Sequence, residues 1–338
     1  MSAGPQISVV IPTYQRRTSV VRALESLCAQ TLPRVMYEVV TVIDGSFDGT
    51  ADALRRLETP YRLVVVEQAN RGQAAARNAG IERAAGELIV FLDDDMVADP
   101  GLLEAHWCAH PDGSRRVVLG SAPIVVKAGA PPLVEYRARR FQERLESLAA
   151  PGYRLTYSDI YTGNLSVQRS LLLDAGLFDE TFRLYGHEDY ELALRLGKAG
   201  AEFAFSSRAV AHQHYEKPFA ALARDSVARG RTAVLFSRKH PEVTSRLKLG
   251  QGAPATAKWR TLRGLLLGLT RMMPATTDIV TRVMESVERR RPRRLDRYYD
   301  MVLDYYYWVG VRATLGSAGA GGAEPTIPTP MSAPSADR

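Results

Sequence analysis

Cysteine is nearly absent from this sequence: its 338 residues include only Cys28 and Cys108. Two cysteines cannot form a disulfide framework, and their wide separation lacks the clustered spacing of a zinc site. The sequence therefore excludes a small domain held together by disulfides. It favours a reducing compartment, and we expect a cytoplasmic protein.

Long hydrophobic runs are missing as well. The most hydrophobic later stretch, Gly264 to Leu269, lies between Arg263 and Arg271. It is far shorter than the roughly 20 residues that a helix needs to cross a bilayer. The N-terminal residues MSAGPQISVVIPTYQRR have no cationic segment followed by a long apolar one, so we expect no secretory signal. Both absences favour a soluble chain.

Most of the chain lacks an excess of either charge, although the formal net charge is +7. Residues 1–257 carry 31 basic and 29 acidic side chains, whereas residues 258–312 carry 12 and 6. The arginines of this second segment are mixed with aromatic residues and leucines. That mixture fits peripheral contact with an anionic membrane, or helices that pack on the body or in a homodimer. No recognised nucleic-acid motif accompanies it, so we expect no nucleic acid partner.

The first hundred residues alternate between two patterns. Near-continuous runs rich in Val and Ile are typical of strands buried on both faces, and helix-like segments separate them. The expected strands are Ile7–Ile11, Val39–Ile43, Leu63–Val66 and Leu88–Leu92. The expected helices are Ser19–Gln30, Thr50–Leu57 and Gln73–Ala85. This order predicts an α/β fold with a predominantly parallel central sheet, whose ligands bind at the carboxyl ends of the strands.

The later sequence predicts further elements and the division of the chain. We expect strands over Val117–Val126, 202–205 and 209–212, and helices over Leu133–Leu148, from Glu188 to Ala199 and over Phe219–Lys239. A short helix is expected after Arg169, following a polar loop. The predicted division is a catalytic domain at 1–250, a basic and aromatic helical extension at 251–315, and a disordered tail rich in Gly, Pro, Ala and Ser at 316–338.

Three adjacent acids, Asp93, Asp94 and Asp95, directly follow one of the predicted strands. Adjacent carboxylates repel one another unless a cation or hydrogen-bond donors compensate. Mg²⁺ typically takes one or two carboxylates together with substrate phosphates and waters. The alternative is a solvated acidic turn that caps the next helix. The position after a strand favours a metal site.

Other polar residues are expected near the same edge. Asp44 also follows a strand, and Arg77 lies on or near a helix, where its planar donor fork suits phosphate or base-edge recognition. Glu188 and Asp189 begin a helix whose dipole favours their ionised forms. Each also has an ordinary structural interpretation: a turn for Asp44, a solvated surface position for Arg77 and helix capping for the two later acids.

Taken together, these segments resemble family 2 glycosyltransferases with a GT-A fold. The resemblance covers roughly residues 6–240 and depends on several motifs that occur in the same order. The motifs are VVIPTYQR, DGSFDGT, NRGQAAARNAG, FLDDDMV, TGNLSVQRSLLLDAGLFDE and GHEDYELALRL. It implies an inverting enzyme that uses a nucleoside diphosphate sugar donor, an acceptor hydroxyl and a divalent metal ion, Mn²⁺ or Mg²⁺.

The resemblance also implies roles for the residues that match the donor site. Asp44 would read the base, Arg77 would hold base or phosphate, Asp93 would face the ribose, and Asp94 belongs to the same site. The strand end formed by Pro12, Thr13 and Tyr14 would line the nucleotide pocket, and the loop residues Gly163 and Asn164 would contact the donor sugar. One departure is visible, because Ile43 precedes Asp44 where members of the family often have paired acids.

Catalysis and metal binding are assigned by the same resemblance. Asp189 would be the general base, with Glu188 beside it, and Asp95 would bind the metal bridging the diphosphate. His212 best matches the histidine that completes the metal site in several GT-A enzymes. His214 is the alternative ligand, because side chains two residues apart on a strand face the same side of the sheet. His187 is expected to be structural.

Two rival functions remain open on the sequence alone. A sugar nucleotidyltransferase generally has a Gly-rich phosphate loop after its first strand, whereas IPTYQRR stands at that place here. A non-catalytic module that binds sugar nucleotides would not require a general base such as Asp189. The donor sugar, its nucleotide and the acceptor are not specified by the motifs.

Overall fold

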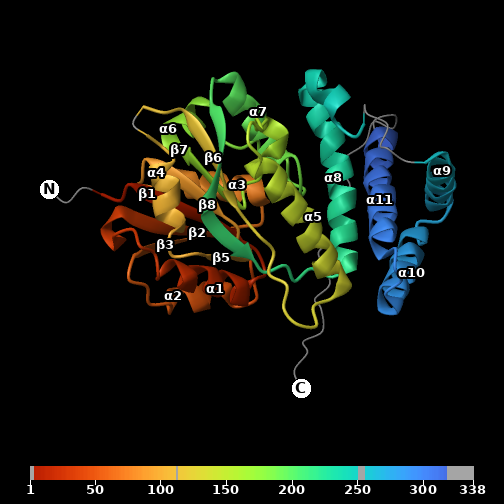
Figure 1. The fold of residues 1–338 in the computed structure, drawn as a ribbon, viewed down its shortest axis with the longest axis horizontal. Coiled ribbons are helices and arrows are strands. Elements are labelled where there is room, and N and C mark those ends of the chain that lie inside the picture. Colours follow the sequence, from red (N-terminus) through yellow and green to blue (C-terminus); the bar gives the residue numbers. More distant parts are fainter. Residues whose placement is uncertain (1–3, 112, 250–255, 318–338) are drawn as a thin grey trace.

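A computed structural model of the chain describes residues 4–111, 113–249 and 256–317. A mixed sheet of eight strands occupies one side of the molecule, and long helices lie on the other (Figure 1). The strand order is β3-β2-β1-β4-β7-β6-β8-β5. The expectation of an α/β fold with a C-terminal helical region is confirmed.

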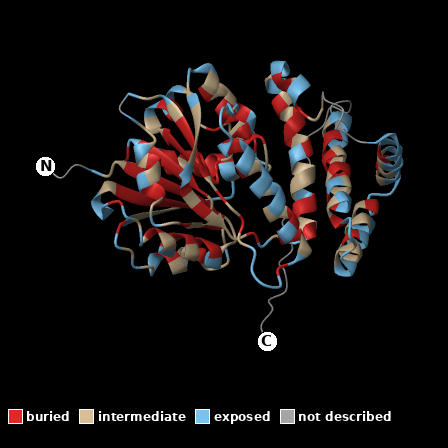
Figure 2. Cartoon of the chain, in the orientation of Figure 1, coloured by how far each residue is buried: buried red, intermediate tan, exposed pale blue. Residues whose placement is uncertain are grey.

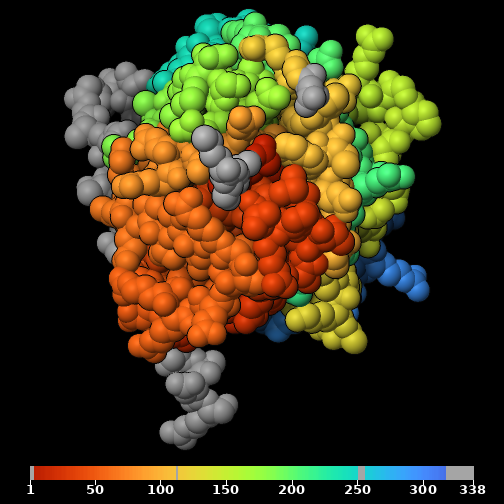
Figure 3. Space-filling view, turned by 90° about the vertical axis from the view of Figure 1, so that its left-hand side faces the viewer, coloured from red at the N-terminus to blue at the C-terminus, as the bar shows by residue number. Residues whose placement is uncertain are grey.

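The first part of the sheet is parallel, as the alternating pattern predicts. The strands are β1 (Ile7–Thr13), β2 (Tyr37–Asp44), β3 (Arg62–Gln68) and β4 (Leu88–Leu92). The helices between them are α1 (Arg17–Leu27), α2 (Thr50–Arg55) and α3 (Gln73–Arg83). Every residue of β1, β2 and β4 is buried, which explains their continuous apolar sequences. This part of the chain forms the red and orange surface in Figure 3.

The second part of the sheet is largely antiparallel and differs from the sequence prediction. β7 (Asn164–Gln168) runs antiparallel between β4 and β6 (Arg116–Ser121). The predicted strands at 202–205 and 209–212 are one strand, β8 (Glu202–Gln213), whose pairing with β6 shifts register between Gly120 and Ser121. The remaining elements are β5 (Met96–Ala98), α4 (Leu102–Cys108), α6 (Arg169–Asp174) and α7 (Glu188–Lys198).

Long helices cover the side of the molecule that faces away from the β3 edge (Figure 1). They are α5 (Pro132–Ala149), α8 (Phe219–Lys239), α9 (Ala257–Met272), α10 (Thr276–Arg290) and α11 (Leu295–Ser317). Short 3-10 turns cover Arg34–Met36, Tyr157–Asp159 and Pro241–Arg246. Among the described helices, none combines the length and hydrophobicity that crossing a bilayer requires.

α11 packs along α8, and α9 and α10 form the outermost layer (Figure 1). Figure 2 shows buried residues throughout the sheet and along α8, and mainly exposed residues on α9. Helices α9 to α11 occupy the segment expected to be a helical extension. The expected tail at 316–338 lies outside the described residues from 318 onward, and the start of the expected extension lies outside them at 251–255.

Candidate functional site

The parallel strands bring their carboxyl ends to one edge of the sheet. Thr13 pairs with Ile43 at the ends of β1 and β2, so Thr13 and Asp44 emerge side by side. The turn after β4 adds the three aspartates at 93–95. These residues line a cavity of about 370 Å³, which we call the strand-end cavity. Its walls include Pro12, Thr13, Tyr14, Arg16, Asp44, Asp93, Asp94, Asp95, Arg137, Tyr185 and Gln213.

The three aspartates have different surroundings. Asp94 accepts hydrogen bonds from Thr13 Oγ1 at 2.8 Å and from Arg16 Nη1 at 2.9 Å. The same Arg16 nitrogen lies 3.1 Å from Asp95 Oδ2. Burial raises the pKa of Asp94 to about 6, although Arg16 opposes the shift. Burial and the neighbouring Asp93 also raise the pKa of Asp95. A further cation at this place would therefore be favoured.

Arg77 connects the aspartates to helix α7. Its side chain is only 2% exposed, and Nη2 lies 3.1 Å from Asp93 Oδ1 while Nη1 lies 3.5 Å from Glu188 Oε1. Its guanidinium also stacks over the Phe178 ring, 5.6 Å from the centroid. The sequence suggested a side chain that meets base or phosphate. In the structure Arg77 forms buried ion pairs with Asp93 and Glu188, because α3 orients its side chain toward the protein interior.

Asp44 holds the loop that follows β3. Its carboxylate accepts hydrogen bonds from Gln68 Nε2, Arg71 N and Gly72 N, each at 2.8 Å. Gly72 has a φ of +90° and directly precedes α3. Asp44 therefore lines the strand-end cavity and also fixes one of its walls.

Helix α7 places two acids at its N-terminal end. Glu188 is buried and accepts a hydrogen bond from Gly186 N at 2.9 Å. Asp189 lies in a second cavity of about 250 Å³, which we call the α7 cavity. Burial and the charge of Glu188 raise the pKa of Asp189 to about 7, against the opposing charges of Arg77 and Arg229. A carboxyl group with this pKa can take up a proton near neutral pH.

The two cavities adjoin each other. Arg137 and Tyr185 line both the strand-end cavity and the α7 cavity. Arg137 Nε is buried and has no hydrogen-bond partner in the described part of the chain. A molecule in one cavity would thus lie next to a molecule in the other, with Asp189 on the α7 side and the aspartates on the strand-end side.

The expected histidine ligand lies elsewhere. On β8, His212 Nε2 contacts Asp99 Oδ1 at 3.0 Å, and its side chain is 40% exposed. The next residue, Gln213, lines the strand-end cavity and lies 3.4 Å from both carboxylate oxygens of Asp95. His214 meets Asp95 through the backbone, since its N–H donates to the carbonyl oxygen of Asp95 at 2.8 Å. Alternation along the strand thus directs Gln213 toward the aspartate and His212 away from it.

The two loop residues expected at the donor sugar differ in position. Gly163 lies against Asp93, where an added Cβ would come within 2.9 Å of Asp93 Oδ2. Asn164 is completely buried, and its Nδ2 donates to the carbonyl oxygens of Ser121 and Ala209 at 2.9 Å. Its Oδ1 also contacts His106 Nε2 at 2.8 Å. Asn164 therefore joins strands inside the sheet instead of facing the cavity.

Several residues that line the two cavities were not predicted from the sequence. Arg16 and Gln213 contact the aspartates, and Arg137 and Tyr185 join the two cavities. Arg16 belongs to the IPTYQRR segment, so its position after the first strand was a usable signal. The others depend on which way a strand or helix faces. His187 agrees with its structural interpretation, because it is buried and its Nδ1 lies 2.9 Å from Thr232 Oγ1.

The carboxylate oxygens of the strand-end cavity suit a divalent metal ion that also binds the phosphates of a ligand. Among the described residues, no group of three or more His, Cys, Asp or Glu side chains is arranged to hold a metal alone. Mg²⁺, however, usually takes one or two carboxylates and completes its shell with phosphates and waters. Within the described ranges, the contact to Asp95 Oδ1 is the long one of 3.4 Å from Gln213, so this oxygen retains lone pairs for a cation.

Comparisons with known proteins show which families this chain resembles. A family model described as glycosyl transferase family 2 matches residues 8–169, and one described as N-terminal domain of galactosyltransferase matches residues 143–217. The chain is 25% identical to an uncharacterised glycosyltransferase of Bacillus subtilis, YfnE, over 88% of this chain and 81% of that protein. It is 33% identical to validoxylamine A glucosyltransferase of Streptomyces hygroscopicus subsp. jinggangensis, over 60% of this chain and 54% of that protein.

A solved structure supports the fold. The mannosyltransferase PcManGT from Pyrobaculum calidifontis, in complex with GDP-Man and Mn²⁺, superposes with a TM-score of 0.60 at 21% identity. The match covers 94% of this chain and 88% of that one. At this identity the likeness concerns the arrangement of helices and strands.

Proposed function

The chain belongs to glycosyltransferase family 2 and is a glycosyltransferase with a GT-A fold, and from this premise we propose the reaction that it performs. It moves a sugar from a nucleoside diphosphate sugar to an acceptor hydroxyl, with inversion and with the aid of Mn²⁺ or Mg²⁺. Family membership sets aside both rival functions, the nucleotidyltransferase and the non-catalytic module. The solved structure of PcManGT is in complex with GDP-Man and Mn²⁺, which supports this class of donor and metal.

One observation carries the proposal: an ion-pair chain joins the two cavities. It runs from Asp93 through the buried Arg77 to Glu188, the residue before Asp189. A rigid connection of this kind holds the acids of the donor side at a fixed position relative to Asp189. Fixed placement of reacting groups is a major source of rate enhancement.

We assign the strand-end cavity to the donor and the α7 cavity to the acceptor. Pro12, Thr13 and Tyr14 line the nucleotide side, with Asp44 holding the loop beside it. Asp93 faces the donor next to Gly163, whose lack of a side chain leaves room there. Asp95 would hold the metal ion, which when bound offsets negative charge on the leaving diphosphate.

The reaction is a single displacement. Asp189 takes the proton from the acceptor hydroxyl while that oxygen attacks the anomeric carbon from the α7 side. The bond between this carbon and the diphosphate oxygen breaks, and the nucleoside diphosphate leaves with the bonding electrons. Attack opposite the leaving group inverts the configuration. Glu188 stays paired with Arg77 and raises the pKa of Asp189, which strengthens it as a base.

The substitution Asp189→Asn tests this assignment. It removes the base but keeps the size of the side chain, so transfer should fall by about 10²–10⁴-fold. Donor binding, measured by titration calorimetry with a panel of sugar nucleotides, should be retained. Asp278→Asn is the matched control, because Asp278 also lies in the first turn of a helix, α10. Full transfer by Asp189→Asn would remove Asp189 from the role of base.

We also propose that the enzyme works in a reducing compartment, the cytoplasm. Cys28 and Cys108 are both free thiols in the structure, and Cys108 is exposed. A protein with unpaired, exposed cysteine is suited to an environment that keeps thiols reduced. Fractionation of cells with thiol labelling would show both the compartment and the redox state.

A further inference from the structure

Helix α9 has an apolar face that the rest of the described chain leaves exposed. Its exposed residues Leu262, Leu265, Leu269 and Met272 follow one another at spacings of three and four, so they lie on one side of the helix. Leu265 is 63% exposed and Met272 is 84% exposed. The residues that attach α9 to the protein, Trp259 and Leu267, are buried on another side.

The apolar surface continues into α10. Met273 lies in the turn between the two helices, and Ile279 and Val283 lie one helical turn apart on α10. All three are exposed, Val283 to 57%. Because α9 and α10 form the outermost layer of the molecule (Figure 1), this surface is open to a large, flat partner. Large exposed apolar patches mark protein or membrane interaction sites, and here exposed apolar residues recur on two consecutive helices.

The same region is strongly basic. Residues 257–297 contain 11 Lys and Arg side chains and 4 Asp and Glu side chains, and α9 contains four basic and no acidic residues. A helix with Leu on one face and basic residues around it is the type that lies in a membrane interface. Basic residues near the surface of an anionic bilayer strengthen such binding.

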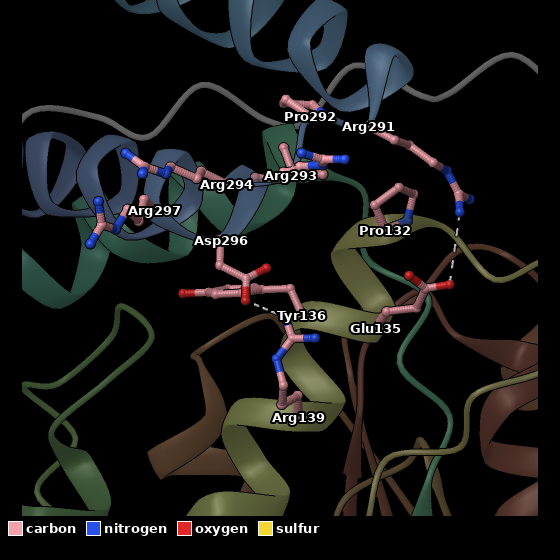
Figure 4. Close-up of a pocket in the computed structure, with 11 residues that line it drawn as sticks. Pro132, Glu135, Tyr136, Arg139, Arg291, Pro292, Arg293, Arg294, Asp296 and Arg297 are labelled. Carbon is pink, nitrogen blue, oxygen red and sulfur yellow. Dashed lines mark hydrogen bonds and ion pairs between the residues drawn. The ribbon is translucent and has the colours of Figure 1, made fainter.

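An arginine-rich cavity follows directly along the chain. It has a volume of about 400 Å³ and lies between the start of α5 and the segment 291–297, which joins α10 to α11 and includes the first residues of α11. Figure 4 shows the α5 side chains facing this segment across the cavity. Its walls include Arg139, Arg291, Arg293, Arg294, Asp296 and Arg297.

Only part of this positive charge is compensated. Arg139 forms an ion pair with Asp296, and Arg291 lies 4.0 Å from Glu135. Within 4–111, 113–249 and 256–317, no carboxylate forms an ion pair with Arg293, Arg294 or Arg297. Arginine is well suited to phosphate groups because of its planar donor fork. This cavity is therefore complementary to the phosphates of lipid headgroups.

We propose that α9, α10 and the segment 291–297 dock the enzyme on an anionic phospholipid surface. The apolar residues of α9 and α10 enter the headgroup boundary, while the unpaired arginines meet lipid phosphates. A second copy of the chain is the less favourable occupant. A symmetric dimer through this surface would bring two positively charged faces together. The proposal does not depend on which sugar the enzyme transfers.

Vesicle co-sedimentation of the full chain tests the proposal. One set of vesicles contains phosphatidylcholine alone, and the other contains phosphatidylcholine with roughly one third phosphatidylglycerol. We expect binding to the second set to be at least about tenfold stronger at low salt and to fall steeply as salt is added. Equal binding to both sets, or none, would overturn the proposal.

Paired variants separate the two parts of the surface. Leu265→Glu with Met272→Glu should reduce binding to anionic vesicles about tenfold or more, and Arg293→Gln with Arg294→Gln should do the same. The control carries Val35→Glu and Leu173→Glu, two exposed apolar positions on the catalytic body. Circular dichroism verifies that each variant is folded.

The result that contradicts a membrane partner is equally specific. In this result, light scattering without lipid shows that the unaltered chain is a dimer. The double substitution Leu265→Glu with Met272→Glu converts the dimer to a monomer but leaves vesicle binding unchanged. In that case the apolar surface belongs to a second copy of the chain. Retained vesicle binding by both paired variants would also overturn the proposal.

Discussion

At the scale of single residues, the site depends on how adjacent carboxylates are divided among partners. Asp93 pairs with Arg77, Asp94 is held by Thr13 and Arg16, and Asp95 shares Arg16 while keeping one oxygen nearly free. The acids share a strand end, yet each has its own surroundings. This division explains how the buried carboxylates of Asp94 and Asp95 can lie next to the partly exposed Asp93.

The metal assignment leads to a prediction that distinguishes Asp95 from His212. Chelation should abolish transfer, and Mn²⁺ or Mg²⁺ should restore it in the unaltered enzyme. Asp95→Asn should lose transfer and require far more metal, because the nearly free carboxylate oxygen is replaced. His212→Ala should respond to metal like the unaltered enzyme, since His212 faces Asp99. Activity in each variant is measured over a range of metal concentrations, and transfer that a chelator leaves unchanged would reject the metal proposal.

The raised pKa of Asp189 predicts a rise in activity with pH. A base must be ionised in the free enzyme, so kcat/KM should increase as pH passes through about 7 and then level off. The ordinary value for this carboxyl is 3.8, so the folded state binds its proton more tightly than the unfolded state. This group therefore lowers stability as pH rises between these values.

The check is a pH profile together with thermal unfolding. Asp189→Asn should lose the rise in kcat/KM and should also weaken the dependence of Tm on pH between about 4 and 7. An unaltered pH profile of the residual activity in this variant would assign the titration to another group.

The sequence could indicate the acids of the site but not all of their partners. Asp44, the aspartates at 93–95 and Asp189 follow from strand ends and a helix start, which are local patterns. Gln213 could not be preferred over His212, because the register of β8 depends on pairing with β5 and β6. Asn164 was assigned to the donor from a motif, whereas its burial between strands depends on the whole sheet.

At the scale of elements, the same limit separates the two halves of the fold. The parallel strands β1, β2 and β4 are buried on both faces, so their composition alone indicates them. β7 has only five residues and is inserted antiparallel between strands that are distant in sequence. No local pattern specifies such an insertion. Phe219–Lys239 was predicted with the bounds of α8, because a long amphipathic segment has a strong signal.

Two glycines allow α11 to pack against α8 at backbone distance. A Cβ added at Gly230 would lie 2.0 Å from the carbonyl oxygen of Tyr307, and one added at Gly310 would lie 2.0 Å from that of Val227. Both contacts are with backbone, which cannot move aside as a side chain could. The glycines therefore set the distance between the two helices.

Gly310→Ala should consequently destabilise the protein. Overpacking at such a contact costs about 1–3 kcal/mol, which denaturant unfolding can measure. Gly264→Ala on α9 is the control, because nothing lies within 4 Å of its added Cβ. There the better helix propensity of alanine should stabilise the helix by about 0.5–1 kcal/mol. Equal effects at the two positions would show that close packing does not hold α11 in place.

At the scale of the whole molecule, the C-terminal helices are joined to the catalytic body by more than one kind of contact. Tyr299 packs on Tyr136 of α5 with ring centroids 4.8 Å apart, in a cluster that includes Phe219. Tyr136 Oη also donates a hydrogen bond to Asp300 Oδ1 of α11 at 2.6 Å. Within the C-terminal helices, Asp304 accepts hydrogen bonds from Trp259 Nε1 at 2.9 Å and Arg263 Nη1 at 2.6 Å, which ties α9 to α11. The basic C-terminal helices are thus attached to the catalytic body through a buried aromatic cluster.

The α11 helix also forms part of a fourth cavity, beside the proposed acceptor site. This cavity of about 400 Å³ is lined by Asp300, Asp304 and Tyr307 of α11, and it shares Tyr190 and Arg229 with the α7 cavity. A large acceptor could extend from Asp189 toward these residues. Helix α11, which follows the segment that we propose to meet the membrane, therefore also contributes a wall next to Asp189, the proposed base.

These contacts predict that the full chain unfolds in one thermal transition, although its catalytic body and C-terminal helices differ in charge. Separating them would expose Tyr136, Phe219 and Tyr299 together, so neither part is stable while the other is open. Burial alone would raise the pKa of Asp304, but hydrogen bonds and charges from Lys248, Trp259 and Arg263 lower it below its ordinary 3.8. Its stabilisation is therefore present at neutral pH and is lost only as pH falls through that lowered value. Calorimetry at pH 7 should show a single peak, and two separate peaks would mean that the helices form an independent unit.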